Sequence, residues 1–479
     1  MRFSEIYKQI VLDSSFENWK KLAKYYMQIN KAHLLMLAKR QILSRELSSE
    51  IAHALKKLEK EEIDDKLPEQ VEDLVLLIEK RLSEMIGVEK AGFLHTARSR
   101  NDIDATVFRM CVRDELIDLS HCLTDFISTI VERARTNLET LVLLYTHGQP
   151  AQVSTFAHYL MALAFDFLEV ANGILNSLEA VNICPMGAGA ITTTGFEIDR
   201  KIVSDYLGFS EPVENSYRAI VTSHWIVFPS SSLKTLMADL TRVVQEFTHK
   251  SSCEVGIFQF PDELVQISSI MPQKRNPVIL EHLRIRANVA HGVFESIERV
   301  FVNTPYQDIN ENGDFVLFKF LDGMKIAKEA LKLAQETVSK VGVDEQRVKD
   351  LALKTGATTT ELADELVRRF KISFRQAHSV VSEYVRSGMK YEMLCESFER
   401  LCGQRLSLTK DELTEILSAE NFVRVRKISG GPHRDRVLEM IQSAERSKEF
   451  FVEKIAQAEK QIAVSFKVLD DHFNTYFGV

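Results

Sequence analysis

A stretch in the second half of the chain spaces its apolar residues alternately three and four positions apart, and this repeat constrains the fold most. After Pro277 it runs through Leu280, Leu283, Ala287, Ala290, Phe294, Ile297 and Phe301. Such spacing is typical of the seam of a coiled-coil-like helix bundle. The 479 residues include 19 glycines and 10 prolines, about half the typical combined usage of roughly 12%. Few helix breakers and this seam together predict an all-α fold with a central bundle of long helices.

Three long helices are expected in a central domain of residues 104–345. The first is expected to start after Asn101, the second at Pro150 and the third at Pro277, because proline suits the first turn of a helix. Residues 1–103 are interpreted as an N-terminal helical domain, and residues 346–479 as a small C-terminal helical domain. The Gly- and Thr-rich stretch 185–200 interrupts the helical pattern and predicts a connecting loop.

Charge and cysteine usage narrow the possible functions. The formal net charge is −8 and no basic stripe is visible, so no nucleic-acid partner is expected. The six cysteines form no CxxC pair, so neither a metal site nor a disulfide is expected. No apolar run approaches the roughly 20 residues that cross a bilayer, and no signal peptide is visible. We therefore expect a cytoplasmic protein without membrane contacts.

Residues 268–277, Ser-Ser-Ile-Met-Pro-Gln-Lys-Arg-Asn-Pro, form the segment that points most directly to chemistry. Pro272 and Pro277 bracket its polar centre, so a loop is predicted up to Asn276. Asn276 and Pro277 then suit the N-cap and the first position of a helix. Backbone N–H groups and two cations would converge where a carboxylate could bind, although a solvated charged loop is the alternative.

Two more loops have unusual polar density. Residues 95–102, His-Thr-Ala-Arg-Ser-Arg-Asn-Asp, carry two arginines that suit bidentate capture of a carboxylate, with a solvated basic turn as the alternative. Residues 146–150, Thr-His-Gly-Gln-Pro, include His147, a residue that often only caps or packs at such a place. Pairing with Glu281 would fix the imidazole tautomer of His147 and raise its proton affinity.

Residues 268–277 resemble the signature of the fumarase and aspartase superfamily, whose members cleave dicarboxylates to release fumarate. The superfamily pattern is Gly-Ser-Ser-x-Met-Pro-x-Lys-x-Asn-Pro, and Ile267 stands in place of its glycine. The resemblance implies a three-domain, all-α subunit in a homotetramer with a twenty-helix core. It also implies that three subunits contribute to each active site, which binds a small dicarboxylate substrate.

Residues 95–102 resemble the argininosuccinate lyases more closely than fumarase, aspartase or adenylosuccinate lyase. Residues 185–200, residues 356–385 and the Gly430-Gly431-Pro432 turn resemble the same family. The resemblance implies a carbon–nitrogen lyase of arginine biosynthesis, which splits argininosuccinate into arginine and fumarate. It implies no cofactor and no metal.

The resemblance also implies roles for single residues. Ser268 would be the base that takes the Cβ proton, and Lys274 and Asn276 would hold the neighbouring carboxylate. His147, paired with Glu281, would handle the proton at the leaving nitrogen. The remaining substrate-binding residues would be Ser99, Arg100, Asn101, Thr146, Gln149 and Asn310. Fixed donors and a cation suit the dianionic aci-carboxylate that forms when the Cβ proton leaves.

The segments expected to recognise the amine depart from the family pattern. Asn310 stands in place of a glutamine and Gly313 in place of a substrate-binding lysine, and residues 215–224 lose an acidic and an arginine position. A related lyase that releases fumarate and a different amine is therefore an alternative, and a non-catalytic structural tetramer is another. No repeat of roughly 20 to 50 residues supports a helical-repeat binding module.

Overall fold

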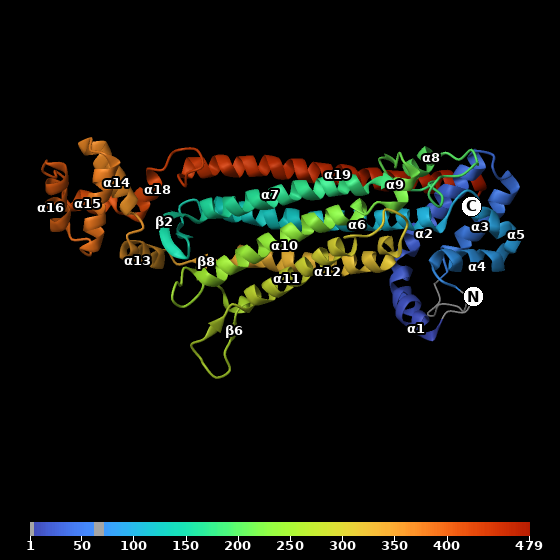
Figure 1. Ribbon diagram of the computed structural model, residues 1–479, viewed down its shortest axis with the longest axis horizontal. Coiled ribbons are helices and arrows are strands. Elements are labelled where there is room, and N and C mark those ends of the chain that lie inside the picture. The colour runs from blue at the N-terminus through green and yellow to red at the C-terminus, as the bar shows by residue number, and fades with distance from the viewer. Residues whose placement is uncertain (1–3, 62–70) are drawn as a thin grey trace.

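The computed structural model describes residues 4–61 and 71–479, and helices dominate it. Long helices run side by side along the longest axis of the molecule (Figure 1). They are α6 (Arg100–Thr136), α7 (Phe156–Val181), α10 (His224–Lys250), α11 (Val278–Val300), α12 (Asp314–Lys340) and α19 (Arg434–Phe477). This arrangement confirms the predicted all-α class and its central bundle of long helices.

The apolar seam predicted from the sequence lies on α11 and faces the bundle interior. Its six residues from Leu280 to Ile297 are at most 1% exposed. The Phe294 ring packs against Phe320 of α12, with ring centroids 5.8 Å apart. Gly323 of α12 permits this close approach, because a Cβ atom there would lie 2.9 Å from the Phe294 ring. The seam therefore fixes how α11 and α12 pack together.

Two further groups of helices lie at the two ends of the bundle (Figure 1). One end holds α1 (Glu5–Tyr7), η1 (Lys8–Asp13), α2 (Ser14–Lys39), α3 (Arg45–Leu58), α4 (Leu74–Ile86), α5 (Val88–Gly92) and η2 (Phe93–His95). The other end holds α13 (Glu345–Thr355), α14 (Thr359–Phe370), α15 (Phe374–Arg386), α16 (Tyr391–Cys402), α17 (Lys410–Ile416) and α18 (Ala419–Arg424). Helix α19 then runs back along the bundle to the first end.

Four short two-stranded ladders connect the helices. The pairs are β1 (Leu141–Thr146) with β2 (Gln149–Thr155), β3 (Ile183–Cys184) with β4 (Glu211–Pro212), β5 (Phe258–Gln259) with β8 (Gly342–Val343), and β6 (Gln266–Ile267) with β7 (Arg275–Asn276). The remaining elements are α8 (Arg200–Tyr206), α9 (Ser216–Val221), η3 (Asp262–Leu264) and η4 (Asn310–Asn312). Residues 185–199 form a connection between β3 and α8, as predicted for 185–200.

The predicted start of the second long helix at Pro150 is wrong. Pro150 lies in β2 opposite Tyr145, and α7 begins at Phe156. The His147-Gly148 turn joins two segments that contain Val142, Tyr145, Val153 and Thr155, residue types that favour strands, and proline is tolerated beside the irregular step of the hairpin. The Thr155 side chain caps α7 by accepting the His158 N–H, so the helix starts only after the hairpin is complete.

Two other predicted helix starts are shifted. Helix α6 begins at Arg100 with Ser99 as its N-cap, not after Asn101. Helix α11 begins at Val278 with Pro277 as its N-cap, whereas Asn276 pairs in β7 and does not cap. The segment predicted to be a loop up to Asn276 therefore ends in a strand at Arg275, because the ladder with β6 satisfies its backbone groups.

Helix α7 departs from the expectation that no apolar run is long enough to cross a bilayer. Among the described residues it is the one helix that meets this criterion by length and composition, and half of its most apolar window is buried. It packs against α6, α10 and α19. A helix that is apolar on most sides is typical of the core of a large protein as well as of a membrane span.

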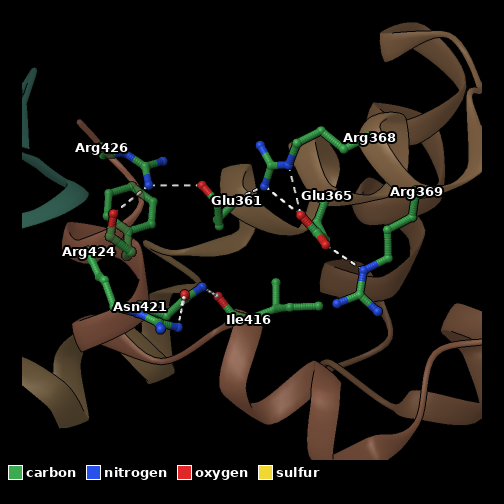
Figure 2. Close-up of polar contacts among 9 residues, drawn as sticks. Glu361, Glu365, Arg368, Arg369, Ile416, Asn421, Arg424 and Arg426 are labelled. Carbon is green, nitrogen blue, oxygen red and sulfur yellow. Dashed lines mark hydrogen bonds and ion pairs between the residues drawn. The ribbon is translucent and has the colours of Figure 1, made fainter. Parts of the chain in front are cut away.

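A network of ion pairs stabilises the C-terminal group of helices (Figure 2). The Glu361 carboxylate on α14 is 4% exposed and pairs with Arg368 and Arg426. Arg426 Nη1 lies 2.9 Å from Glu361 Oε2 and donates to the Phe422 carbonyl at 2.6 Å. Arg424, by contrast, pairs at the surface with Glu415. The buried pair joins α14 to the segment that follows α18.

We predict that Arg426→Ala lowers the free energy of unfolding far more than Arg424→Ala. Loss of Arg426 leaves a buried carboxylate with only one partner and costs on the order of 3 kcal/mol. Loss of Arg424 removes an exposed pair and costs less than about 1 kcal/mol. Chemical denaturation of both variants measures the difference, and equal losses would contradict this account of the network.

Candidate active site

The N-terminus of α6 carries three of the predicted binding residues. Ser99 Oγ accepts the Asn101 N–H at 3.4 Å, and Ser99 N–H donates to Asp102 Oδ1 at 2.8 Å. The second Asp102 oxygen accepts the N–H groups of Gly187 and Gly189, each at 2.9 Å. Asp102 is fully buried. It therefore fixes the loop after β3 against the start of α6.

Arg100 and Asn101 are occupied by carboxylates of the same chain. Arg100 Nη1 lies 2.7 Å from Asp73 Oδ2, and the hydrogen bond from Arg100 to Asp73 raises the pKa of the guanidinium. Asn101 Nδ2 donates to Asp308 Oδ2 at 2.8 Å and to the Ala190 carbonyl at 3.3 Å. The two side chains thus already bind carboxylates, which is the chemistry predicted for them with a substrate.

A cleft of about 430 Å³ opens beside these residues, and Asn310 also lines it. Arg100 is the one basic residue among the lining residues that the structure describes. The acidic lining residues are Glu72, Asp73, Asp104, Asp308 and Asp314, and Trp19, Phe108 and Trp225 form apolar walls. Burial raises the pKa of Asp104 to about 7, although Asp104 accepts a hydrogen bond from the Tyr26 hydroxyl at 2.7 Å. The cleft suits a ligand with a cationic part.

Thr146, His147 and Gln149 lie on the turn between β1 and β2. His147 has φ of 51° and Gly148 has φ of 73°, and two positive φ values in a two-residue turn define a type I′ hairpin. All four residues from Thr146 to Gln149 are exposed. The turn therefore presents the imidazole to the outside of this chain.

Ser268 begins the loop between β6 and β7. Its Oγ accepts the backbone N–H of Ile270 at 3.3 Å and that of Met271 at 3.0 Å. Its own N–H donates to the Lys274 carbonyl at 3.2 Å. The Lys274 side chain is exposed and makes no ion pair with any residue in the described ranges. Donated N–H groups favour negative charge on an oxygen, and two of them reach Ser268 Oγ.

The predicted site residues lie in three separate segments of one chain, namely the start of α6 with the nearby Asn310, the β1–β2 turn, and the β6–β7 loop with the start of α11. Ser99, Arg100, Asn101 and Asn310 lie at one end of the bundle, and the His147 turn lies at the other end, beyond the far end of α6 (Figure 1). Helix α6 has 37 residues and spans about 55 Å at roughly 1.5 Å per residue. Among the residues described, no hydrogen bond or ion pair joins His147 to Glu281, which is exposed on the first turn of α11.

Sequence reasoning missed the carboxylates around Arg100. Asp73 precedes α4 and Asp308 lies before η4, so neither is near α6 in the sequence. Asp104 follows a predicted site loop, yet an acidic residue near a helix N-terminus usually only complements the helix dipole. In the ranges 4–61 and 71–479, no group of three or more His, Cys, Asp or Glu side chains could hold a metal ion.

Comparison with known proteins identifies the family. Residues 5–292 match the family described as lyase, and residues 356–424 match the argininosuccinate lyase C-terminal family. Argininosuccinate lyase 2 of Agrobacterium fabrum is 37% identical over 439 residues, which cover 89% of this chain and 87% of that protein. The chain belongs to the argininosuccinate lyase family. The argininosuccinate lyase of Methanococcus aeolicus is 32% identical over 90% of this chain and 88% of its own length.

Solved structures of the fumarase and aspartase superfamily have the same fold as this argininosuccinate lyase family member. An EDDS lyase in complex with formate superposes with a TM-score of 0.86 and 25% identity over all of this chain and 97% of its own. A class II fumarase from Schistosoma mansoni has a TM-score of 0.68 and 16% identity, over 84% of this chain and 90% of its own. The predicted superfamily and fold are confirmed.

We predict that Asp102→Asn changes how stability depends on pH. Burial raises the pKa of Asp102 from 3.8 to about 6, despite the hydrogen bonds from Ser99, Gly187 and Gly189. The folded protein therefore binds more protons than the unfolded chain between pH 4 and 6, so this carboxyl lowers stability as pH rises through that window. Wild type should lose up to about 3 kcal/mol relative to Asp102→Asn between pH 4 and 7, as denaturant unfolding measures. Parallel pH profiles would contradict the assignment.

Proposed function

We propose that the chain is an argininosuccinate lyase, which eliminates fumarate from argininosuccinate and leaves arginine. The observation that carries this proposal is the 37% identity to argininosuccinate lyase 2 of Agrobacterium fabrum over 89% of this chain. The match of residues 356–424 to the argininosuccinate lyase C-terminal family supports it independently. The chain is accordingly a carbon–nitrogen lyase.

In the proposed reaction the Ser268 alkoxide takes the Cβ proton of the succinyl half. The C–H electron pair first moves into the neighbouring carboxylate, which becomes the aci-carboxylate. The pair then forms the double bond of fumarate as the C–N bond breaks, and His147, paired with Glu281 across a subunit interface, supplies a proton to the leaving nitrogen. A serine serves as a base only when its alkoxide is stabilised, and two backbone N–H groups already donate to Ser268 Oγ. Lys274 and Asn276 stabilise the aci-carboxylate, and losing one such donor typically costs about 10²–10³ in rate.

The other predicted residues bind the substrate in this proposal. Arg100 and Asn101 exchange their internal partners Asp73 and Asp308 for a substrate carboxylate, because both side chains are half-exposed at the cleft. Ser99 caps the N-terminus of α6, which carries both residues. Asn310 lines the same cleft, and Thr146 and Gln149 approach it with the His147 turn.

The active protein is proposed to be a cytoplasmic homotetramer in which three subunits complete each site. The roughly 55 Å length of α6 separates the residues at its start from the His147 turn within one chain, so a site that contains both needs more than one subunit. Ile285 and Val289 on α11 are 55% and 49% exposed, and Phe228 on α10 is 45% exposed. Such apolar side chains on the bundle surface suit contacts between subunits.

Each subunit is proposed to have three domains, at residues 1–103, 104–345 and 346–479. Within residues 346–479, α19 packs into the main core, whereas helices α14 to α17 have an apolar core of their own, which includes Leu362, Leu394 and Phe398. This core is separate from the main one, which joins the bundle to the N-terminal helices.

A second candidate function keeps fumarate as a product and changes the amine. Its support is the segment of Asn310 and Gly313, which departs from the family pattern expected for amine recognition and lines the acidic cleft. A solved EDDS lyase variant with bound fumarate also has a TM-score of 0.86 with this chain. Running the reaction in reverse, with fumarate and a panel of amines, discriminates between the two candidates by which adduct forms fastest.

We predict that the wild-type protein releases fumarate from argininosuccinate and that Ser268→Ala is slower by at least about 10²-fold, the usual contribution of a positioned base. The ultraviolet absorbance of fumarate follows the reaction. Ser269→Ala is the matched control, because Ser269 is the exposed neighbour and should keep most of the activity. A fast Ser268→Ala enzyme would refute the role of Ser268 as base, whereas an inactive wild type would refute the substrate.

We also predict that two strongly impaired variants, each with measurable residual activity, restore activity when they assemble together. Ser268→Ala and His147→Asn alter two of the three loops, 268–277 and 146–150, and we propose that each of the three loops in one site comes from a different subunit. Mixed tetramers then contain some sites with both native groups, so activity should return after the two proteins are dissociated and reassembled together. Each variant reassembled alone is the control. Activity no higher in the mixture than in the controls would show that one subunit supplies both groups.

A further inference from the structure

The turn that carries His147 is exposed, but β1, the strand that leads to it, contacts the buried ammonium group of Lys250. Lys250, the last residue of α10, is 0% exposed. Its Nζ donates to the Leu143 carbonyl of β1 at 2.8 Å and lies 3.0 Å from Glu246 Oε1. Burial lowers the pKa of Lys250. A lysine in such a place loses its hydration, so its contacts with β1 and Glu246 must replace water.

The same ammonium group contacts the residue just before the turn. Lys250 Nζ lies 4.4 Å from the centre of the Tyr145 ring, within the range of a cation–π contact. The His249 ring meets Tyr145 edge-on, with centroids 5.0 Å apart. Tyr145 is two residues before His147. The contacts with Lys250 and His249 therefore fix β1 close to the turn.

Lys250 spans an irregularity in the hairpin. The register of β1 and β2 shifts between Leu144 and Tyr145, and a bulge of this kind bends a strand and re-aims the side chains beyond it. Lys250 bonds the Leu143 carbonyl before the shift and the Tyr145 ring after it. One side chain thus fixes the backbone on both sides of the step that determines where His147 points.

The other strand is held separately. His158 Nδ1 lies 2.8 Å from Ser154 Oγ, and its Nε2 lies 3.0 Å from the Gly430 carbonyl. Because a carbonyl only accepts, Nε2 carries the proton of a neutral His158 and Ser154 donates to Nδ1. This contact anchors the end of β2 before α7, whereas Lys250 is the anchor at the bulge in β1.

We propose that Lys250 is a positioning residue, which fixes the β1 bulge and thereby aims the His147 turn at the substrate. The inference rests on the proposed role of His147 in proton transfer. Lys250 touches none of the residues proposed to bind substrate, so it acts through the hairpin. An apolar residue of similar length would fill the same space but would release the Leu143 carbonyl and the Tyr145 ring.

The decisive experiment compares Lys250→Met in two backgrounds. In the otherwise native enzyme, kcat for fumarate release should fall about 10- to 100-fold, because small misplacements of a reacting group cost up to about 10²-fold. In His147→Asn, the same change should lower kcat less than about twofold, since there is no imidazole left to aim. An equal loss in both backgrounds, or no loss in the native one, would overturn the proposal.

A second pair of variants tests the same contact without removing the buried charge. Tyr145→Leu removes the ring that Lys250 contacts, whereas the matched Tyr145→Phe keeps the ring and removes only the hydroxyl. Tyr145→Leu should lower kcat and Tyr145→Phe should leave it near the native value. Equal activity of the two variants would count against the proposal, even if Lys250→Met fails to fold.

Hydrogen exchange separates this inference from the proposed function. In folded Lys250→Met, the amides of residues 142–146 should exchange faster than in wild type, and those of α11 should not change. If the hairpin exchanges faster in Lys250→Met but the native enzyme does not cleave argininosuccinate, the proposed substrate is wrong and the role of Lys250 in fixing the hairpin still stands. If exchange at the hairpin is unchanged, Lys250 does not fix the hairpin, whatever the activity of the enzyme.

Discussion

The length of α6 is the constraint on which the rest of the structure depends. Its 37 residues bury an apolar face against α7 and α12 along the bundle, so the helix cannot shorten or bend without exposing core residues. Polar groups at its two ends are consequently kept far apart within one chain. The buried Asp102 ties one end to the loop after β3, and the β1–β2 hairpin follows the other.

The bundle was readable from the sequence because burial repeats with the helical period. Every seam residue from Leu280 to Ile297 is buried as the spacing predicts. Prediction failed where two signals compete: Pro150 suits a helix start, but Leu141–Thr146 pairs with the residues around it. Strand pairing depends on a partner segment and on tertiary packing, which a local proline rule does not include.

For the candidate site, the sequence supplied a prediction of residue types but none of the surrounding acidic residues. Motif resemblance located the Ser268 loop, and the structure adds that backbone N–H groups converge on its Oγ. The carboxylates at Arg100 and Asn101 come from Asp73 and Asp308, which are distant in the sequence. Lys250 was also missed, because a charged residue at a helix end is ordinarily a solvated one.

The contacts of α19 with helices near the N-terminus affect how the chain folds during its synthesis. Its Asp470 reaches back to the buried Lys31 of α2 across 439 residues, and its contacts include α2, α3, α6 and α7. During synthesis the amino-terminal helices emerge long before this partner exists, and their apolar faces stay uncovered for that interval. Contacts of such high sequence separation slow folding and favour intermediates. Chaperone demand in the cell should therefore fall sharply once α19 leaves the ribosome.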